Sequence, residues 1–406
     1  MPRLMPFIAI LFSTAVFAGE LPIVKPESVG MSSSRLKAVD GVMNKQVADK
    51  KIAGGIVMIS RNGKIAMFNT YGRMDIEADK PMQKDTIFRI YSMTKSITTA
   101  AAMILYDEGK LKPEDPASKF VPEMKGVKVL GKDGDRKPSR EMTVADLMRH
   151  TAGVLYGWGG GPVDKKYQAI KPLESKNLDE FGKKLGQLPL QYEPGKDWIY
   201  SVSIDVLGLV VQRASGKRFD TFLDERIFKP LDMKDTGFHV PKSKHDRFAA
   251  NYSHKLKVVD APATSKYAKP TTFHSGGGGL VSTTRDYMRF LVMILNDGEL
   301  HGTRILKKKT VAMMKTNQLP KEAFPIYFGT AVRHGTGFSY GFSVRVSNSQ
   351  WDPAARIGEY GWGGAASTHY WTSPRDNLIV VTLEQRMPYT FETEWAIKKI
   401  IYDAIE

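Results

Sequence analysis

Strand patterns occur near both ends of this chain, and the long segment between them is mostly helical in pattern. Near the start, apolar runs at 56–60 and 65–70 flank Asn62-Gly63, a dipeptide that favours a tight β-hairpin. Three later runs also have strand character: 342–346, 369–372 and 378–383. Because strands need partners, the simplest fold is one sheet built from both chain ends, with helices inserted between them.

Helical spacing accounts for most of the remaining chain. A first helix is predicted at 32–49, with Ser32 as its N-cap. Later helices are predicted at 96–108, 143–150, 203–214, 219–228, 284–296 and 392–405, with a short strand at 279–282. The expected fold class is α/β (α+β), an antiparallel sheet flanked by N- and C-terminal helices plus an inserted, mostly helical domain. We expect residues 27–90 and 280–406 to form the sheet domain and residues 91–279 the helical domain, with the active site at their junction.

The composition excludes several chemistries. The chain of 406 residues has no cysteine, which excludes disulfide scaffolds, cysteine nucleophiles, thiolate zinc sites and a lipoprotein anchor. The formal net charge is +16, but Lys and Arg are spread along the chain with Asp and Glu between them, so we expect no nucleic-acid partner. The eight histidines include no pair with metal-ligand spacing, and we expect neither a metal nor another cofactor.

The first 18 residues have the features of an export signal. Arg3 precedes an apolar stretch at 7–17, and Val16-Phe17-Ala18 fits a signal-peptidase site, so cleavage is predicted after Ala18. An ordinary apolar helix is the alternative, but the polar, proline-containing segment that follows argues against it. No later stretch is long enough to cross a bilayer. We therefore expect an exported protein, periplasmic or secreted, without an integral membrane span.

The most informative short segment is Ser92-Met93-Thr94-Lys95. Ser92 stands where a helix is predicted to begin, near unpaired backbone amides and the positive end of the helix dipole. Lys95 projects from the same face one turn later. A serine nucleophile needs local positive charge and a nearby base, and this spacing supplies the charge. Four residues alone are weak evidence, because the same spacing also occurs at solvated helix starts.

Two further segments strengthen that interpretation. Tyr200-Ser201 stands just before the helix predicted at 203–214, and Gly361-Trp362-Gly363-Gly364-Ala365 precedes the last strand pair. In this order, the three motifs resemble those of the class C β-lactamase and penicillin-recognising serine hydrolase superfamily, and most closely its esterase branch, the family VIII carboxylesterases. Supporting segments resemble the family as well: 106–111, 147–153 and 275–283.

The resemblance implies a β-lactamase/transpeptidase-like fold and a cofactor-free serine mechanism. Ser92 would attack a carbonyl and form an acyl-enzyme, with Lys95 and Tyr200 as the other catalytic residues. Tyr200 could act as a base only if a cation held its phenolate, because a free tyrosine titrates near ~10. The backbone N–H groups of Ser92 and Ala365 would form the oxyanion hole. The substrate pocket would include these residues: Tyr91, Trp362, Gly363 and Gly364.

Two departures from the family pattern favour neutral esters over anionic amides. Trp362 stands where β-lactamases and transpeptidases commonly carry a lysine that helps to recognise a substrate carboxylate. Val202 stands where the penicillin-recognising pattern usually has asparagine, so an amide that would hold an acylamino side chain is missing. Some relatives still hydrolyse certain β-lactams, so weak side activity of this kind is compatible with the resemblance.

A second serine and a histidine are interpreted as structural residues. Gly337-Phe338-Ser339-Tyr340-Gly341 matches the Gly-x-Ser-x-Gly elbow of α/β-hydrolases, which requires a helix after the serine. Strand alternation follows instead, so Ser339 is interpreted as a strand or turn residue. His150 is expected to brace the active-site loop rather than bind a metal.

The sequence therefore predicts an exported serine carboxylesterase that cleaves short-to-medium acyl esters of small molecules. The alternatives are a β-lactamase or D-alanyl-D-alanine carboxypeptidase, and a non-catalytic protein that binds anionic wall polymers on the same scaffold. Amide substrates such as nylon oligomers also remain compatible with the motifs. The sequence leaves open whether the loops 125–140 and 153–176 cover the pocket.

Overall fold

The computed structural model describes residues 19–406, so the predicted export signal lies outside the described residues. An eight-stranded antiparallel sheet combines early and late strands of the described chain, in the order β12-β13-β14-β15-β16-β1-β2-β3. Its strands are β1 (Gly54–Arg61), β2 (Lys64–Asp75), β3 (Lys80–Pro81), β12 (Thr336–Phe338), β13 (Ser343–Arg345), β14 (Tyr360–Gly364), β15 (Thr368–Ser373) and β16 (Leu378–Glu384). The predicted antiparallel sheet is thus confirmed.

The pairing of early and late strands follows from their sequences. Asn62 and Gly63, with φ of 55° and 72°, form the turn between β1 and β2, and both adopt the left-handed backbone that a tight hairpin needs. On the other side of β1 lies β16, so that Ile59 pairs with Val380. Both strands are almost fully buried, which explains why their patterns are continuously apolar.

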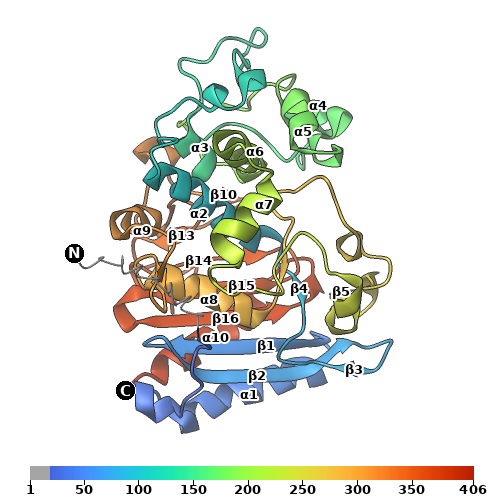
Figure 1. The fold of residues 1–406 in the computed structure, drawn as a ribbon, viewed down its shortest axis with the longest axis vertical. Coiled ribbons are helices and arrows are strands. Elements are labelled where there is room, and N and C mark those ends of the chain that lie inside the picture. Colours follow the sequence, from blue (N-terminus) through green and yellow to red (C-terminus); the bar gives the residue numbers. More distant parts are fainter. Residues whose placement is uncertain (1–18) are drawn as a thin grey trace, which may run out of the picture.

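Helices cover both faces of the sheet. Helices α1 (Ser33–Ala48) and α10 (Glu392–Asp403) lie against one face, where Val57 and Val380 point into their core. On the other face, Met58 joins a larger core that includes α2 (Thr94–Asp107) and α8 (Thr284–Leu295). Figure 1 shows α1 below the sheet and α8 above it, with α2 further up, beyond α8. The period of two along each strand therefore divides the apolar residues between two cores.

The regular elements of the inserted segment are mostly helices, as predicted. Besides α2, its helices are α3 (Val144–Met148), α4 (Pro162–Ile170), α5 (Leu178–Leu185), α6 (Ser203–Ser215) and α7 (Phe219–Leu223), and α9 (Lys308–Lys315) follows α8. The helix predicted at 219–228 is interrupted, because α7 continues as a π-helical turn at Asp224–Phe228. Short strand pairs complete the fold: β4 (Phe88–Arg89) with β7 (Val281–Ser282), β5 (Asn251–Ser253) with β6 (Val258–Asp260) and β17 (Arg386–Met387), β8 (Glu299–Leu300) with β9 (Thr303–Arg304), and β10 (Tyr327–Phe328) with β11 (Ala331–Val332). How the chain divides into domains stays a prediction.

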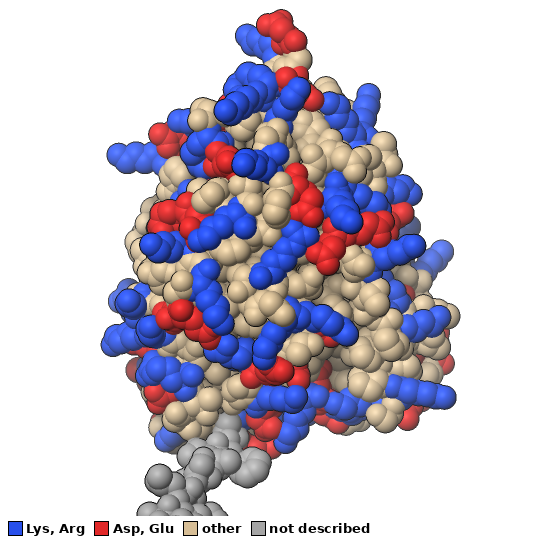
Figure 2. Space-filling view, turned by 45° about the horizontal axis from the view of Figure 1, so that its top comes forward, with Lys and Arg blue, Asp and Glu red and all other residues tan. Residues whose placement is uncertain are grey.

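The surface charge is mixed rather than gathered in one patch on the face that Figure 2 shows. Lys and Arg are abundant there, and Asp and Glu lie between them. This arrangement agrees with the even spread of both charge types along the sequence. Among residues 19–406, no helix is both long and apolar enough to cross a membrane.

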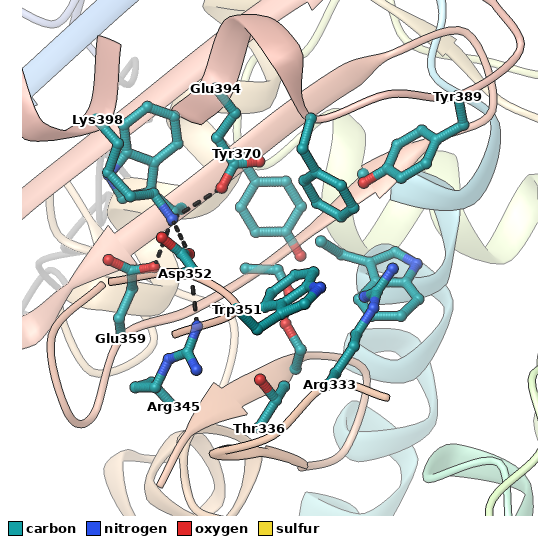
Figure 3. Close-up of a pocket in the computed structure, with 16 residues that line it drawn as sticks. Arg333, Thr336, Arg345, Trp351, Asp352, Glu359, Tyr370, Tyr389, Glu394 and Lys398 are labelled. Atoms are coloured by element: carbon teal, nitrogen blue, oxygen red, sulfur yellow. Dashed lines mark hydrogen bonds and ion pairs between the residues drawn. The ribbon is translucent and has the colours of Figure 1, made fainter. Parts of the chain in front are cut away.

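A buried charge cluster joins α10 to the sheet end that carries β13 and β14. The ammonium of Lys398 lies 2.8 Å from Asp352, 2.9 Å from Glu359 and 2.8 Å from Glu394. Figure 3 shows these three carboxylates around the Lys398 nitrogen. His369 is 2.9 Å from the second oxygen of Glu394. Since the cluster is nearly inaccessible, removal of one partner would leave an uncompensated buried charge.

We predict that Glu394→Gln destabilises the fold at neutral pH and that this effect fades in acid. Burial alone would raise the pKa of Glu394, but Lys398 and His369 outweigh it and lower the pKa to about 2, from an ordinary value of 4.5. A carboxylate with a lowered folded-state pKa stabilises the fold above its unfolded pKa and loses that contribution as the pH falls through the folded value. The gap in unfolding free energy, about 3 kcal/mol at pH 7, should close between about pH 4.5 and 2.

Urea unfolding of both proteins at stepped pH measures this gap. The exposed Glu322→Gln variant is the control and should show no gap at any pH. A Glu394→Gln gap that stays constant from pH 7 to pH 2 would contradict the prediction.

Candidate active site

Ser92 lies at the junction of the sheet and the helical segment, in a tight turn just before α2. The turn is a 3-10 helix, η2 (Tyr91–Met93), and α2 starts at Thr94. Ser92 is partly exposed, whereas Lys95 is buried. Tyr91 has a φ of 41°, a left-handed conformation that is unfavourable for a bulky residue and is typical of functional sites. The N–H of Ser92 belongs to the first helical turn, whose N–H groups have no partner inside the helix.

Lys95 holds three acceptors from three separate segments. Its Nζ donates hydrogen bonds to Ser92 Oγ at 3.3 Å, to the hydroxyl of Tyr156 at 2.9 Å and to the carbonyl oxygen of Gly277 at 2.6 Å. These three bonds use all the N–H groups of the ammonium. The predicted Ser92–Lys95 contact is therefore present, and the lysine is fixed in place by two further bonds.

Tyr200 contacts Lys95 with its ring rather than with its hydroxyl. The Lys95 nitrogen lies 4.6 Å from the centre of the Tyr200 ring, which places the cation over the π face. The Tyr200 hydroxyl accepts a hydrogen bond from Trp362 Nε1 at 3.3 Å. Among the described residues, neither Ser92 nor Lys95 is hydrogen-bonded to that hydroxyl. The structure thus brings Tyr200 to the predicted site, with its oxygen held by the third motif.

Tyr156 is a site residue that the sequence analysis missed. It lies in the loop 153–176, stacks on Trp158 at a ring separation of 4.1 Å and bonds to Lys95. Burial raises the pKa of Tyr156 well above its ordinary value of 10, and Tyr200 and Asp205 raise it further. Tyr156 is therefore a neutral phenol near pH 7. The aromatic residues in this loop were the only sequence signal that could have suggested it.

The glycine-rich segment 275–279 supplies the carbonyl that holds Lys95. Asp205, in the first turn of α6, accepts hydrogen bonds from the N–H of Gly277 at 3.0 Å and from the hydroxyl of Ser275. A Cβ on Gly277 would lie 2.3 Å from the other Asp205 oxygen, so only glycine fits there. Burial raises the pKa of Asp205, and Lys95 opposes this rise.

The third motif packs directly against the turn that carries Ser92. A Cβ on Gly364 would lie 2.4 Å from the carbonyl oxygen of Ile90, which shows how closely the end of β14 approaches η2. Ala365 follows Gly364 in the turn between β14 and β15 and is partly exposed. A Cβ on Gly363 would lie 2.5 Å from the hydroxyl of Tyr389. These glycines permit the approach that places the Ala365 backbone beside the Ser92 segment.

An aromatic cavity of about 210 Å³ opens beside the two tyrosines. Its lining comes mainly from the loop 153–176 and from β10, and includes Tyr156, Trp158, Tyr200, Tyr327 and Phe328. The predicted loop 153–176 therefore lines the site mainly through the residues before α4, which forms within it at Pro162–Ile170. The loop 125–140 lines a different cavity.

Tyr91 points elsewhere, because its ring packs on Tyr267 and its hydroxyl accepts a hydrogen bond from Asn251. The structure thus gives Tyr91 no side-chain contact with the Lys95 group.

His150 and Ser339 occupy structural positions. The buried His150 ring packs 4.9 Å from the Tyr200 ring, and burial, with a contribution from Lys95, lowers its pKa well below 6.5. Ser339 is buried after β12 and donates its hydroxyl to the carbonyl of Phe342, with no helix after it. Within residues 19–406, no group of three or more His, Asp or Glu is arranged to hold a metal ion.

Comparisons with known proteins agree with this geometry. A family model described as Beta-lactamase matches residues 39–401. An uncharacterized protein of Mycobacterium tuberculosis is 36% identical over 353 residues, covering 83% of this chain and 86% of that protein. Esterase EstB of Burkholderia gladioli is 28% identical over 397 residues, covering 90% of this chain and 94% of EstB. The structure of EstCE1, described as a hydrolase with promiscuous acyltransferase activity, is 25% identical with a TM-score of 0.78, covering 91% of this chain and 98% of EstCE1.

We predict that Gly364→Ala slows the reaction of Ser92 with a fluorophosphonate by about 100-fold. The new Cβ would meet the Ile90 oxygen and Thr368 Oγ1, both at 2.4 Å, so β14 must move away from η2 and take the Ala365 N–H with it. Loss of one oxyanion-hole donor typically costs 10²–10³ in rate. Gly41→Ala, at a helical position with open space around it, is the matched control. Equal labelling rates in both variants would contradict the prediction.

Proposed function

Since this chain belongs to the beta-lactamase family, and its relatives include esterases, we propose that it is a serine hydrolase that cleaves short-to-medium acyl carboxylic esters through an acyl-enzyme on Ser92. One observation carries this proposal: the buried ammonium of Lys95 lies 3.3 Å from Ser92 Oγ, and among the described residues no carboxylate pairs with that ammonium. Its positive charge therefore remains available to an alkoxide that develops on Ser92.

Acylation begins with removal of the Ser92 proton. We assign this step to the Tyr200 oxygen as general base; it accepts a hydrogen bond from Trp362 Nε1, and the Lys95 nitrogen lies 4.6 Å from the centre of the Tyr200 ring. Ser92 Oγ then bonds to the ester carbonyl carbon, and the carbonyl electrons move to oxygen. The N–H groups of Ser92 and Ala365 would receive that oxyanion. The tetrahedral intermediate collapses as the alcohol leaves with the proton from Tyr200.

Deacylation repeats these steps with water as the nucleophile. Tyr200 takes a proton from water, the hydroxide bonds to the acyl carbon, and the second intermediate expels Ser92 Oγ, which recovers the proton. The carboxylic acid is released and Ser92 is free again. In this scheme Tyr156, as a neutral phenol bonded to Lys95, acts as a positioning residue.

Three features support an ester rather than a penicillin-type substrate. Val202 is fully buried, so the position that resembles the asparagine of penicillin-recognising enzymes offers no amide. Trp362 presents an aromatic ring and one donor that Tyr200 already uses. The aromatic cavity beside Tyr200 suits an apolar acyl or alcohol group of limited size. Esterase activity in EstB and hydrolase activity in EstCE1 are consistent with this choice.

We also propose that the enzyme acts after export, in the periplasm or outside the cell. This part of the proposal depends on the sequence of residues 1–18 alone, with cleavage after Ala18.

Ser92→Ala should abolish hydrolysis of p-nitrophenyl butyrate, because the nucleophile is lost. Mass spectrometry after brief exposure to the ester or to a fluorophosphonate should locate the adduct on Ser92. Ser339→Ala is the matched control and should retain activity. A variant that hydrolyses the ester without Ser92 would refute the assignment, and faster turnover of a chromogenic cephalosporin than of the ester would favour a β-lactamase.

Tyr200→Phe should reduce kcat by about 10²–10⁴, the usual contribution of a general base, and flatten the limb of the pH profile on which kcat rises with pH. Tyr156→Phe should cost about tenfold and leave the shape of that profile unchanged, because only one hydrogen bond to Lys95 is lost. The measurement is kcat against pH for both variants. A larger loss of kcat and an altered pH profile in Tyr156→Phe would instead identify Tyr156 as the general base.

A further inference from the structure

A second cavity, of about 50 Å³, lies between the end of α10 and strands β13 and β14. Gly361, Gly363 and Trp362 form one of its walls, so it borders the third motif. Figure 3 shows Lys398 and its carboxylates on one side of this cavity and Arg333 on the other, with Trp351 between them. The cavity has room for a carboxylate or for a few water molecules.

Arg333 is a buried cation without a polar partner. Its side chain is only 6% exposed, and its guanidinium lies over four aromatic rings at 4.6 to 5.3 Å from their centres: Phe328, Trp351, Trp362 and Phe391. Among the described residues, no oxygen accepts a hydrogen bond from this guanidinium and no carboxylate lies within ion-pair distance of it. Aromatic stacking offsets part of the cost of burial but supplies no acceptor for five N–H groups.

The nearby acidic residues are already engaged. Asp352 pairs with Lys398 and Arg345, and Glu359 pairs with Lys398 and with the hydroxyl of Tyr402.

Glu394 uses one oxygen for Lys398 and the other for His369. The second nitrogen of His369 lies 2.9 Å from the carbonyl oxygen of Thr390, so the ring is held between Glu394 and Thr390. Each carboxylate of the cluster therefore already has a partner, and none of them remains for Arg333.

Two other donors on the cavity wall also have no partner among the described residues. These are the hydroxyl of Thr336 and the indole N–H of Trp371, both buried. Buried donors are rarely left unsatisfied, because each costs about 1–3 kcal/mol without an acceptor. An anionic ligand with several hydrogen-bond acceptors would satisfy these unpaired donors and neutralise the buried positive charge beside the cavity.

We propose that this cavity binds a carboxylate carried by the substrate, with Arg333 as its counter-ion. The proposal rests on the esterase function above and narrows it to esters that bear a carboxylate away from the reacting carbonyl. A carboxylate offers two planar oxygens to the guanidinium fork and cancels its charge. Arg333, in the loop after β11, would then recognise the substrate carboxylate, which Trp362 cannot do.

The position of Arg333 fits a group attached to an ester at Ser92. Arg333 stacks on Trp362 and Phe328, and both of those rings contact Tyr200, at 5.4 and 5.0 Å between ring centres. Gly363, on the cavity wall, immediately precedes the glycine that abuts the Ser92 turn. Arg333 therefore acts as a specificity residue, outside the reacting atoms.

The first test compares matched neutral and anionic esters. In the first pair, mono-4-nitrophenyl glutarate carries a carboxylate on the acyl side and is compared with neutral 4-nitrophenyl pentanoate. In the second pair, 4-carboxyphenyl butyrate carries the carboxylate on the alcohol side and is compared with neutral phenyl butyrate. Arg333→Met should lower kcat/KM for one anionic ester by about 10- to 100-fold and leave its neutral partner within about threefold. The pair of esters whose rate ratio changes shows whether the bound carboxylate lies on the acyl side or on the alcohol side of the ester.

Arg356→Met is the matched control, because Arg356 also stacks on an aromatic ring but pairs with Asp376. It should leave the ratio of anionic to neutral rates unchanged. If Arg333→Met fails to fold, Arg333→Lys replaces it, with a smaller loss expected because lysine lacks the planar fork. An active Arg333 variant with unchanged ratios in both arms would overturn the proposal.

The second test needs no turnover and so separates this proposal from the catalytic one. Calorimetric titration of the Ser92→Ala variant should detect monomethyl glutarate but not dimethyl glutarate, and Arg333→Met in that background should abolish the signal. Binding that persists without Arg333, or a cavity that takes chloride with no preference for the carboxylate, would overturn the proposal even if Ser92 proves to be the nucleophile.

Discussion

The ammonium of Lys95 organises the site, because it is buried and yet bonded only to neutral oxygens. Its three acceptors come from the Ser92 turn, from the loop that carries Tyr156 and from the glycine-rich segment at Gly277. A cation in this position can be held only if all three segments keep their places. Asp205 fixes the third of them by binding the Gly277 N–H. The geometry of several distant loops is thus tied to one nitrogen atom.

Three buried cations in this chain illustrate three different uses of charge. Lys398 is surrounded by carboxylates, so its charge is neutralised within the cluster that joins α10 to the sheet. Lys95 has oxygens but no ion pair among the described residues, which leaves its field available to a developing alkoxide. Arg333 has neither among those residues, only aromatic rings. Lys398, whose charge is paired with carboxylates, thus has a structural role, whereas the roles that we propose for Lys95 in catalysis and for Arg333 in binding both depend on the absence of such pairing.

The sequence correctly predicted those structural features that depend on local residue spacing or on short motifs. The hairpin at Asn62-Gly63 was correct because two left-handed residues in a turn have a clear signature. The contact between Ser92 and Lys95 was correct because residues three apart share one helix face.

Long-range contacts were less accessible to sequence reasoning. Tyr156 bonds to Lys95 across 61 positions in the chain, and no periodicity encodes such a contact. Arg333 was missed because its isolation is a property of the folded core rather than of its neighbours in sequence. The hydroxyl of Tyr200, expected near Ser92 or Lys95, is bonded to Trp362, since the indole that replaces a lysine is long enough to reach it.

The pairing of β1 with β16 has a consequence for how the molecule is made. Strand β1 can pair early with β2, but Ile59 meets its other partner, Val380 of β16, only when nearly the whole chain is available. Such non-local pairing slows folding and keeps a growing chain loose. The sheet would therefore be completed only after its C-terminal strands have been made.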